Sequence, residues 1–129
     1  MDANGTIQLG PYGGNIGVGT TTPTQKLHVI GNILTSGTLT ENSDIKLKTN
    51  IQIIPNALDK VLQLRGVEFD RIDMDDEHQI GVIAQEVEKI IPEVVYGEET
   101  KSVAYGNIVA VLIEAIKELT QRVTELENK

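Results

Sequence analysis

The sequence predicts an α+β fold with short helices, β-hairpins and a long C-terminal coiled-coil-like helix, trimeric and preceded by a Gly/Thr-rich β stalk. Three observations predict it. Residues 1–42 are rich in glycine and threonine, residues 43–104 mix helical and strand periods, and residues 105–126 repeat apolar residues in heptads. The composition changes near residue 42, which predicts two domains, 1–42 and 43–129.

The first segment, residues 1–42, predicts the end of a β stalk. It holds eight of the twelve glycines and eight threonines but only three charged side chains. Short alternating pieces at residues 16–18 and 27–30 are separated by clusters of Gly, Pro and Thr that are typical of turns. Such pieces cannot bury an apolar face alone, so we expect several chains to wrap around one axis and share an interior. The alternative is a flexible linker.

The next stretch predicts a short helix and a hairpin. Residues 55–64, PNALDKVLQL, carry leucine and valine at helical spacing, and Pro55 suits the first turn because its missing N–H costs nothing there. Residues 66–72 alternate in polarity, and an acidic turn at 73–78 leads into residues 79–84. This pattern is typical of a β-hairpin.

A second helix and a second hairpin follow. Residues 85–91, QEVEKII, predict a short helix that Pro92 stops, because the residue before a proline disfavours helical conformation. Residues 94–96 and 102–104 flank a loop that contains Gly97, which is the spacing of a hairpin.

Residues 105–126 carry the most regular pattern in the chain, a row of apolar residues that we call the heptad seam. Its β-branched residues at a and leucines at d formally favour two strands, but further apolar residues broaden the face and favour three. The alternative is an amphipathic helix that folds back on its own domain. The seam consists of Tyr105, then Val109, Ile116 and Val123 at a, and Leu112, Leu119 and Leu126 at d; the broadening residues are Ile108, Ile113 and Ala115.

Charge and composition exclude several classes of function. The net charge is −8, from 19 acidic and 11 basic side chains, which argues against a surface for nucleic acid or for an anionic membrane. No apolar run reaches the length of a membrane span, and no secretion signal follows Met1. Cysteine is absent and aromatic residues make up only 3%, so aliphatic side chains must form a thin core, which favours oligomerisation.

The candidate ligands predict neither a metal site nor a cofactor. His28 and His78 lie in unlike segments, and neither has a second histidine at ligand spacing. The acidic residues from Asp70 to Glu77 lack the central glycine and the terminal glutamate of a calcium-binding loop, so we interpret them as a solvated turn. The glycines of residues 10–19 match no phosphate-binding fingerprint.

Ser43 and Lys48 lie at the composition boundary and are a candidate nucleophile and base. A serine hydroxyl becomes a nucleophile when a desolvated, neutral lysine takes its proton. Residues five apart share neither the face of a strand nor adjacent turns of a helix, so contact requires a bend between them. The alternative is that Ser43 or Asp44 caps a turn while Lys46 and Lys48 are surface charges.

Four segments of the sequence resemble the intramolecular chaperone domain of phage endosialidases, tailspikes and tail fibres, which is classed as peptidase S74. They occur in order and cover nearly all of residues 43–129. The preceding GNIGVGTTTPTQKLHVIGNILTSGTLT also resembles the repetitive stalk that commonly precedes this domain. The four segments are SDIKLKTNI at 43–51, NALDKVLQLRGVEF at 56–69, IGVIAQEVEKIIPEVV at 80–95 and VAYGNIVAVLIEAIKEL at 103–119.

The resemblance implies a homotrimer that assembles a viral tail fibre or tailspike and then cuts itself off. Residues 43–129 would be the chaperone, and residues 1–42 the end of the upstream fibre passenger. The family's Ser-Lys dyad matches Ser43 and Lys48, which implies a single-turnover serine peptidase that acts in cis. Lys46 stands where the family usually has arginine, whose bidentate contacts a lysine cannot make. The implied location is the virion, after assembly in the host cytoplasm.

The chemistry expected from this dyad is an intramolecular acyl transfer. Ser43 Oγ gives its proton to Lys48 and attacks the carbonyl of Asn42, and water hydrolyses the resulting ester, so the cut falls between Asn42 and Ser43. A cut after Ser43 is also compatible with the sequence. One alternative is a non-cleaving trimerisation module of the same fold. Another is a membrane-tethered or DNA-binding regulator that carries the same domain, against which the absence of an apolar span and a basic region counts.

Overall fold

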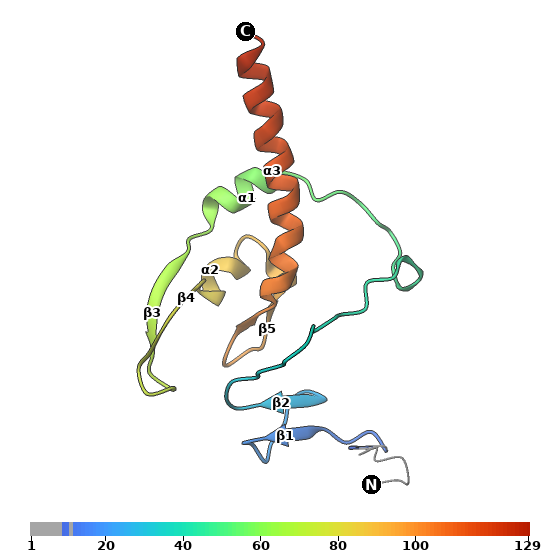
Figure 1. Cartoon of the computed structure of the whole chain (residues 1–129), viewed down its shortest axis with the longest axis vertical. Helices are drawn as coiled ribbons and strands as arrows, with labels where there is room; N and C mark the ends of the chain where they lie inside the picture. Colours follow the sequence, from blue (N-terminus) through green and yellow to red (C-terminus); the bar gives the residue numbers. More distant parts are fainter. Residues whose placement is uncertain (1–8, 11) are drawn as a thin grey trace. The chain divides into compact units, whose positions relative to one another are not determined.

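The computed structural model describes residues 9–10 and 12–129, and it confirms a mixture of helices and small sheets with a C-terminal helix (Figure 1). The chain divides into two compact units, Met1–Leu47 and Lys48–Lys129. Residues 1–8 and 11 of the predicted stalk lie outside the described residues. The domain boundary expected at residue 42, the stalk and the trimer stay predictions.

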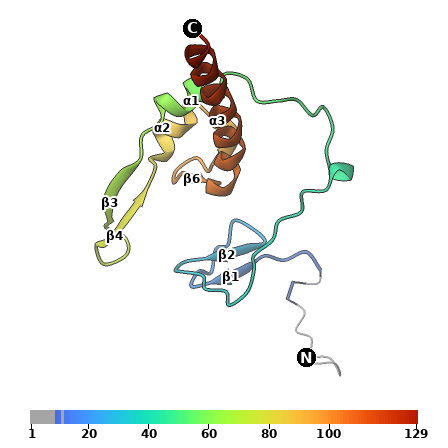
Figure 2. The same cartoon turned by 45° about the horizontal axis from the view of Figure 1, so that its top comes forward.

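The described part of the first unit contains one pair of short strands, seen side by side in Figure 2. β1 (Ile16–Val18) and β2 (Leu27–Val29) form where the sequence predicts strands, and they pair in parallel. The connection is short for a parallel pair, which usually needs a crossover of a dozen or more residues. Side-chain hydrogen bonds to backbone carbonyls tie it down. They run from Asn15 Nδ2 to the Pro23 oxygen at 3.2 Å, and from the Lys26 ammonium to the Gly13 oxygen.

Both predicted short helices form, with shifted ends. α1 spans Ala57–Gln63 rather than 55–64, because Asn56 has a left-handed φ of 53° that leaves Pro55 outside the helix. α2 spans Ala84–Glu88 and is therefore shorter than the predicted helix 85–91. A separate 3-10 turn, η2 (Pro92–Val94), follows it.

Both predicted hairpins are confirmed. In the first, alternate residues Val67, Phe69 and Arg71 are half-buried, as the alternation predicts. Its turn holds Asp75 and Asp76 at positive φ, which aspartate tolerates better than most residues do. The antiparallel pairs are β3 (Val67–Arg71) with β4 (Glu77–Gly81), and β5 (Val95–Tyr96) with β6 (Ser102–Val103).

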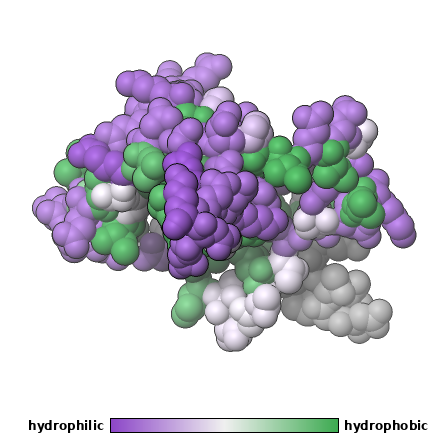
Figure 3. All heavy atoms as spheres, turned by 90° about the horizontal axis from the view of Figure 1, so that it is seen from above, coloured by the Kyte–Doolittle hydropathy of each residue, from purple (hydrophilic) through white to green (hydrophobic). Residues whose placement is uncertain are grey.

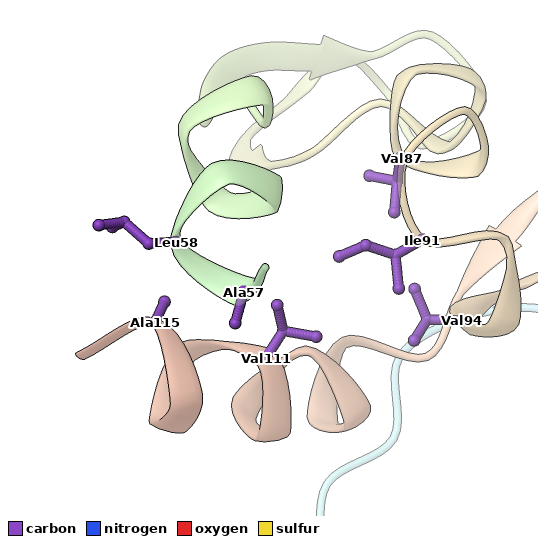
Figure 4. Close-up of a cluster of buried hydrophobic side chains, with 7 residues drawn as sticks. All are labelled: Ala57, Leu58, Val87, Ile91, Val94, Val111 and Ala115. Carbon is purple, nitrogen blue, oxygen red and sulfur yellow. The ribbon is translucent and has the colours of Figure 1, made fainter. Parts of the chain in front are cut away.

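The second unit has a small, wholly aliphatic core, formed where the short helices meet α3 (Tyr105–Glu127). Figure 4 shows Ala57 of α1 close to Val111 of α3, with Ile91 beside them. The predicted helix at 105–126 is thus confirmed, and one side of it closes the core. The buried side chains are Ala57, Leu58, Val87, Ile91, Val94, Val111 and Ala115.

Candidate functional site

A turn separates the two residues of the predicted dyad. The 3-10 turn η1 spans Ile45–Leu47, with Ser43 shortly before it and Lys48 directly after it. Asp44 caps this turn, because its Oδ1 accepts a hydrogen bond from the Lys46 N–H at 2.9 Å. The capping role that the sequence offered to Ser43 or Asp44 is therefore filled by Asp44. The bend that a five-residue spacing requires is present, while the dyad itself stays a prediction.

The whole segment around the dyad is exposed in the single chain. Every residue from 30 to 53 is exposed, including Asn42, Ser43 and Lys48. Isoleucine and leucine side chains share this exposure, with Ile53 78% accessible. Catalytic lysines are typically desolvated in apolar pockets, whereas this segment is open to water in the single chain. Any exclusion of water from Ser43 and Lys48 therefore has to come from atoms outside residues 30–53 of this chain.

α3 has two apolar faces, and only one of them is used within the chain. Ile108, Val111 and Ala115 pack into or against the core. The prediction that Ile108 and Ala115 broaden the seam is therefore wrong, because both serve the chain's own core, and only Ile113 of the three broadening residues is exposed. The heptad seam lies on other faces of the helix, and its members are between 41% and 67% exposed. Folding back on its own domain and presenting a seam are thus compatible for this helix. The exposed seam residues are Tyr105, Val109, Leu112, Ile116, Leu119, Val123 and Leu126.

The segment that follows the dyad lies along α3. Residues 51–54 and the α3 residues Ala110, Ile113 and Glu114 line an open groove of about 340 Å³. Ile113 is 49% exposed and Ile51 is 65% exposed, so apolar surface extends from the helix onto this segment. Figure 3 shows hydrophobic residues, in green, at several places on a largely hydrophilic surface.

Two contacts of α3 were missed by the sequence reasoning. Glu118 accepts hydrogen bonds at the start of α1, from Ala57 N–H to Oε1 at 3.2 Å and from Leu58 N–H to Oε2 at 2.6 Å. The Tyr105 hydroxyl accepts one from the Val82 N–H at 3.1 Å. The sequence gives no signal for the Glu118 contact, because Asn56 precedes α1 and is a residue type that often caps a helix, although its side chain makes no cap hydrogen bond in the structure. Nothing in the local sequence identifies the distant residue that replaces it.

The remaining candidate side chains have ordinary partners. His78 Nδ1 lies 2.7 Å from Asp70 Oδ1 across the first hairpin, and His28 Nδ1 lies 3.3 Å from the Thr24 N–H. Asp73 of the acidic turn pairs with Arg71, whose hydrogen bond lowers the pKa of that carboxyl. In the described part of the chain, no three His, Asp or Glu side chains gather closely enough to hold a metal ion. None of the helices described there combines the length and apolar character that a membrane crossing needs.

The predicted dyad, the two short helices and the first hairpin fall within one region of the chain that matches a known protein family. Residues 43–96 match the model of the peptidase S74 family, described as chaperone of endosialidase. This part of the chain belongs to that family, which confirms the resemblance seen in the sequence.

The relatives are long proteins that share a short region with this chain. The long tail fibre protein Gp37 of Enterobacteria phage K3 is 39% identical over 97 residues, covering 67% of this chain and 8% of that protein. Gp37 of phage T2 is also 39% identical over 97 residues, covering 67% and 7%. An uncharacterized membrane protein of Dictyostelium discoideum is 36% identical over 96 residues, covering 62% and 6%. This chain therefore spans less than a tenth of the length of these relatives.

Proposed function

We propose that this chain carries the intramolecular chaperone of a phage tail fibre or tailspike. Residues 43–129 bring identical fibre chains together as a homotrimer, with residues 1–42 as the end of the fibre passenger. The domain then releases itself by cutting before Ser43. The family of residues 43–96 and the tail fibre relatives support this proposal.

The exposed heptad seam is the observation that carries the proposal. α3 already buries Val111 and Ala115 in its own domain, so its fold gives no reason for a second apolar face. Identical helices joined along the seam bury that face, and the hydrophobic effect then favours association. The apolar side chains of residues 51–54 extend the same surface, so partner chains would also cover the segment downstream of Lys48.

Assembly also supplies what the dyad lacks in the single chain. Once partner chains exclude water around Lys48, its neutral amine takes the proton of Ser43 Oγ. The oxygen attacks the Asn42 carbonyl, the nitrogen of Ser43 leaves as an amine, and water hydrolyses the ester that remains. The nucleophile and the carbonyl belong to adjacent residues, and such proximity contributes up to roughly 7–11 kcal/mol in well-oriented cases. Cleavage then reports completed assembly.

Denaturing mass spectrometry of freshly made protein tests the chemistry. The wild-type chain should yield pieces of residues 1–42 and 43–129, whereas Ser43→Ala and Lys48→Ala should stay whole. Lys46→Ala is the matched control, because its side chain lies in the same turn and should slow cutting only mildly. Persistent cutting at this bond in Ser43→Ala would contradict the assignment of the nucleophile.

A non-cleaving assembly module is the second candidate, and the exposed seam supports it equally well. Light scattering and denaturing mass spectrometry on the same samples together separate the two. A trimer that never cuts supports the module, and a monomer at micromolar concentration overturns both.

A further inference from the structure

Glu118 lies at the point of α3 where residues that pack on the core give way to residues that are exposed. Before it, Val111 and Ala115 are buried in the core of the second unit. After it, every residue from 119 to 129 is exposed. Helical segments this short are marginal in water without packing, so the last turns of α3 gain little stability from their own domain. Partner helices along the seam are what would hold these turns in helical form.

On its other side, Glu118 holds the start of α1. Its two carboxylate oxygens accept the Ala57 and Leu58 N–H groups, which have no partner within their own helix. A carboxylate is favoured at this end of a helix by the backbone dipoles as well, and hydrogen bonds to a charged acceptor are the stronger kind. Arg122 of α3 also forms a weaker ion pair with α1, in which its Nη2 lies 3.7 Å from Asp59 Oδ1.

The start of α1 is also the end of the segment that begins at Lys48. Ile54 packs against the core, and residues 51–54 line the groove along α3. A fixed Ala57 therefore restricts the segment from its downstream end. Glu118 touches none of the reacting atoms, so any effect on cutting must act through this segment.

We propose that Glu118 is a positioning residue that couples assembly along the seam to the cleavage segment. When copies of the chain join, partner helices stabilise the last turns of α3, which are already helical in the single chain, and keep the Glu118 carboxylate on the Ala57 and Leu58 amides. The anchored α1 then holds the segment from Lys48 to Asn56 in its working position. This inference rests on the proposed function and specifies how assembly would control that site.

Amide hydrogen exchange of Leu58 tests the coupling without depending on cleavage. The full chain carries Ser43→Ala so that it stays uncut. Its exchange is measured at a low concentration, where single chains dominate, and at a high concentration, where trimers form. Exchange of the Leu58 amide should be about tenfold slower in the trimer than in the single chain, and Glu118→Ala should abolish this difference. Equal exchange in single chains and trimers overturns the coupling, because a merely structural cap protects the amide in both. Single chains at every concentration refute the proposed function, and the coupling with it.

Cleavage of the chain with Ser43 intact supplies the second readout. Glu118→Ala should assemble but cut about tenfold more slowly, and Glu118→Gln should restore part of the rate because its amide oxygen still accepts one hydrogen bond. Glu125→Gln is the matched control, since Glu125 is exposed on the same helix and accepts a hydrogen bond from Gln121 Nε2 at 3.0 Å.

The outcomes separate the coupling from its rivals. Suppose that Glu118→Ala forms a trimer, loses the protection of the Leu58 amide and still cuts at the wild-type rate. Glu118 is then only a helix cap, and the proposal is refuted. If Glu118→Ala fails to assemble, Glu118→Gln decides by the same two readouts. A wild-type trimer that never cuts refutes the dyad, whereas the exchange of Leu58 still decides the coupling.

Discussion

The two units of the chain differ in what they bury. The second unit has seven buried side chains, whereas no described residue of the first unit is buried. An isolated pair of strands is marginally stable in water, so backbone pairing of β1 with β2 cannot by itself hold the first unit firmly. This contrast indicates that packing within the chain stabilises the second unit, whereas the first unit needs apolar surface from outside itself to bury its side chains.

The same contrast recurs within α3. The side that packs on α1 belongs to the core, and the heptad seam is exposed. Large exposed apolar surfaces in a folded protein usually mark interaction sites. The chain thus carries a self-sufficient fold and partner-dependent surfaces in one molecule, and each can be disturbed separately.

The largest effect is expected from Leu119→Asp, which places a charge in the seam. Burying an unpaired charge costs about 3–5 kcal/mol, so association should fail and cutting should stop. The second unit should stay folded, because Leu119 is outside its core. Light scattering, circular dichroism and limited proteolysis check this, with residues 12–47 expected to become more sensitive to protease. Leu62→Asp, an exposed site on α1 outside the seam, is the control and should still associate.

A smaller effect is expected from Val87→Ala in the core of the second unit. Val87 is only 1% exposed, and truncating it removes buried methyl groups and leaves a cavity. The free energy of unfolding should fall by about 1–3 kcal/mol in a denaturant titration. Val18→Ala in the first unit, where the side chain is 52% exposed, should change it far less. Equal losses at both sites would break the contrast between the units.

Tyr105→Phe should slightly lower the free energy of unfolding of the second unit. The hydroxyl accepts from the Val82 N–H at 3.1 Å, and losing such a hydrogen bond costs about 0.5–1.5 kcal/mol. Gly81→Ala tests the same contact from the other side, because an added Cβ would lie 2.4 Å from the Tyr105 hydroxyl oxygen. We expect the double variant to lose less than the sum of the two, measured by thermal unfolding, because both changes act on one contact.

The smallest effect is expected from Asp73→Asn at the exposed turn of the first hairpin. The Arg71 hydrogen bond lowers the pKa of Asp73, so the pair adds stability above the ordinary aspartate pKa and loses it as the pH falls through the lowered value. The melting temperatures of wild type and variant should therefore differ slightly near neutral pH and converge in acid. High salt should also remove the difference. A difference that grows in acid would contradict this sign.

Local patterns in the sequence were enough to predict most helices and strands and to identify the segment that carries Ser43 and Lys48. Alternation predicted β3 and β4, heptads predicted α3, and the words around Ser43 and Lys48 identified the family. Helix ends were less predictable, because Asn56 adopts a left-handed conformation that the helical spacing of its neighbours does not indicate.

Spacing between neighbouring residues encodes the heptad seam and the two hairpins, so the sequence alone was sufficient to predict them. The turn between Ser43 and Lys48 was known only from the structure. Which face of α3 is buried depends on packing against α1 and could not be predicted from the sequence, since both Val111 and the seam residues are apolar. The tertiary structure also decided that Glu118 caps α1, because a hydrogen bond between residues about sixty positions apart depends on packing that no local pattern records.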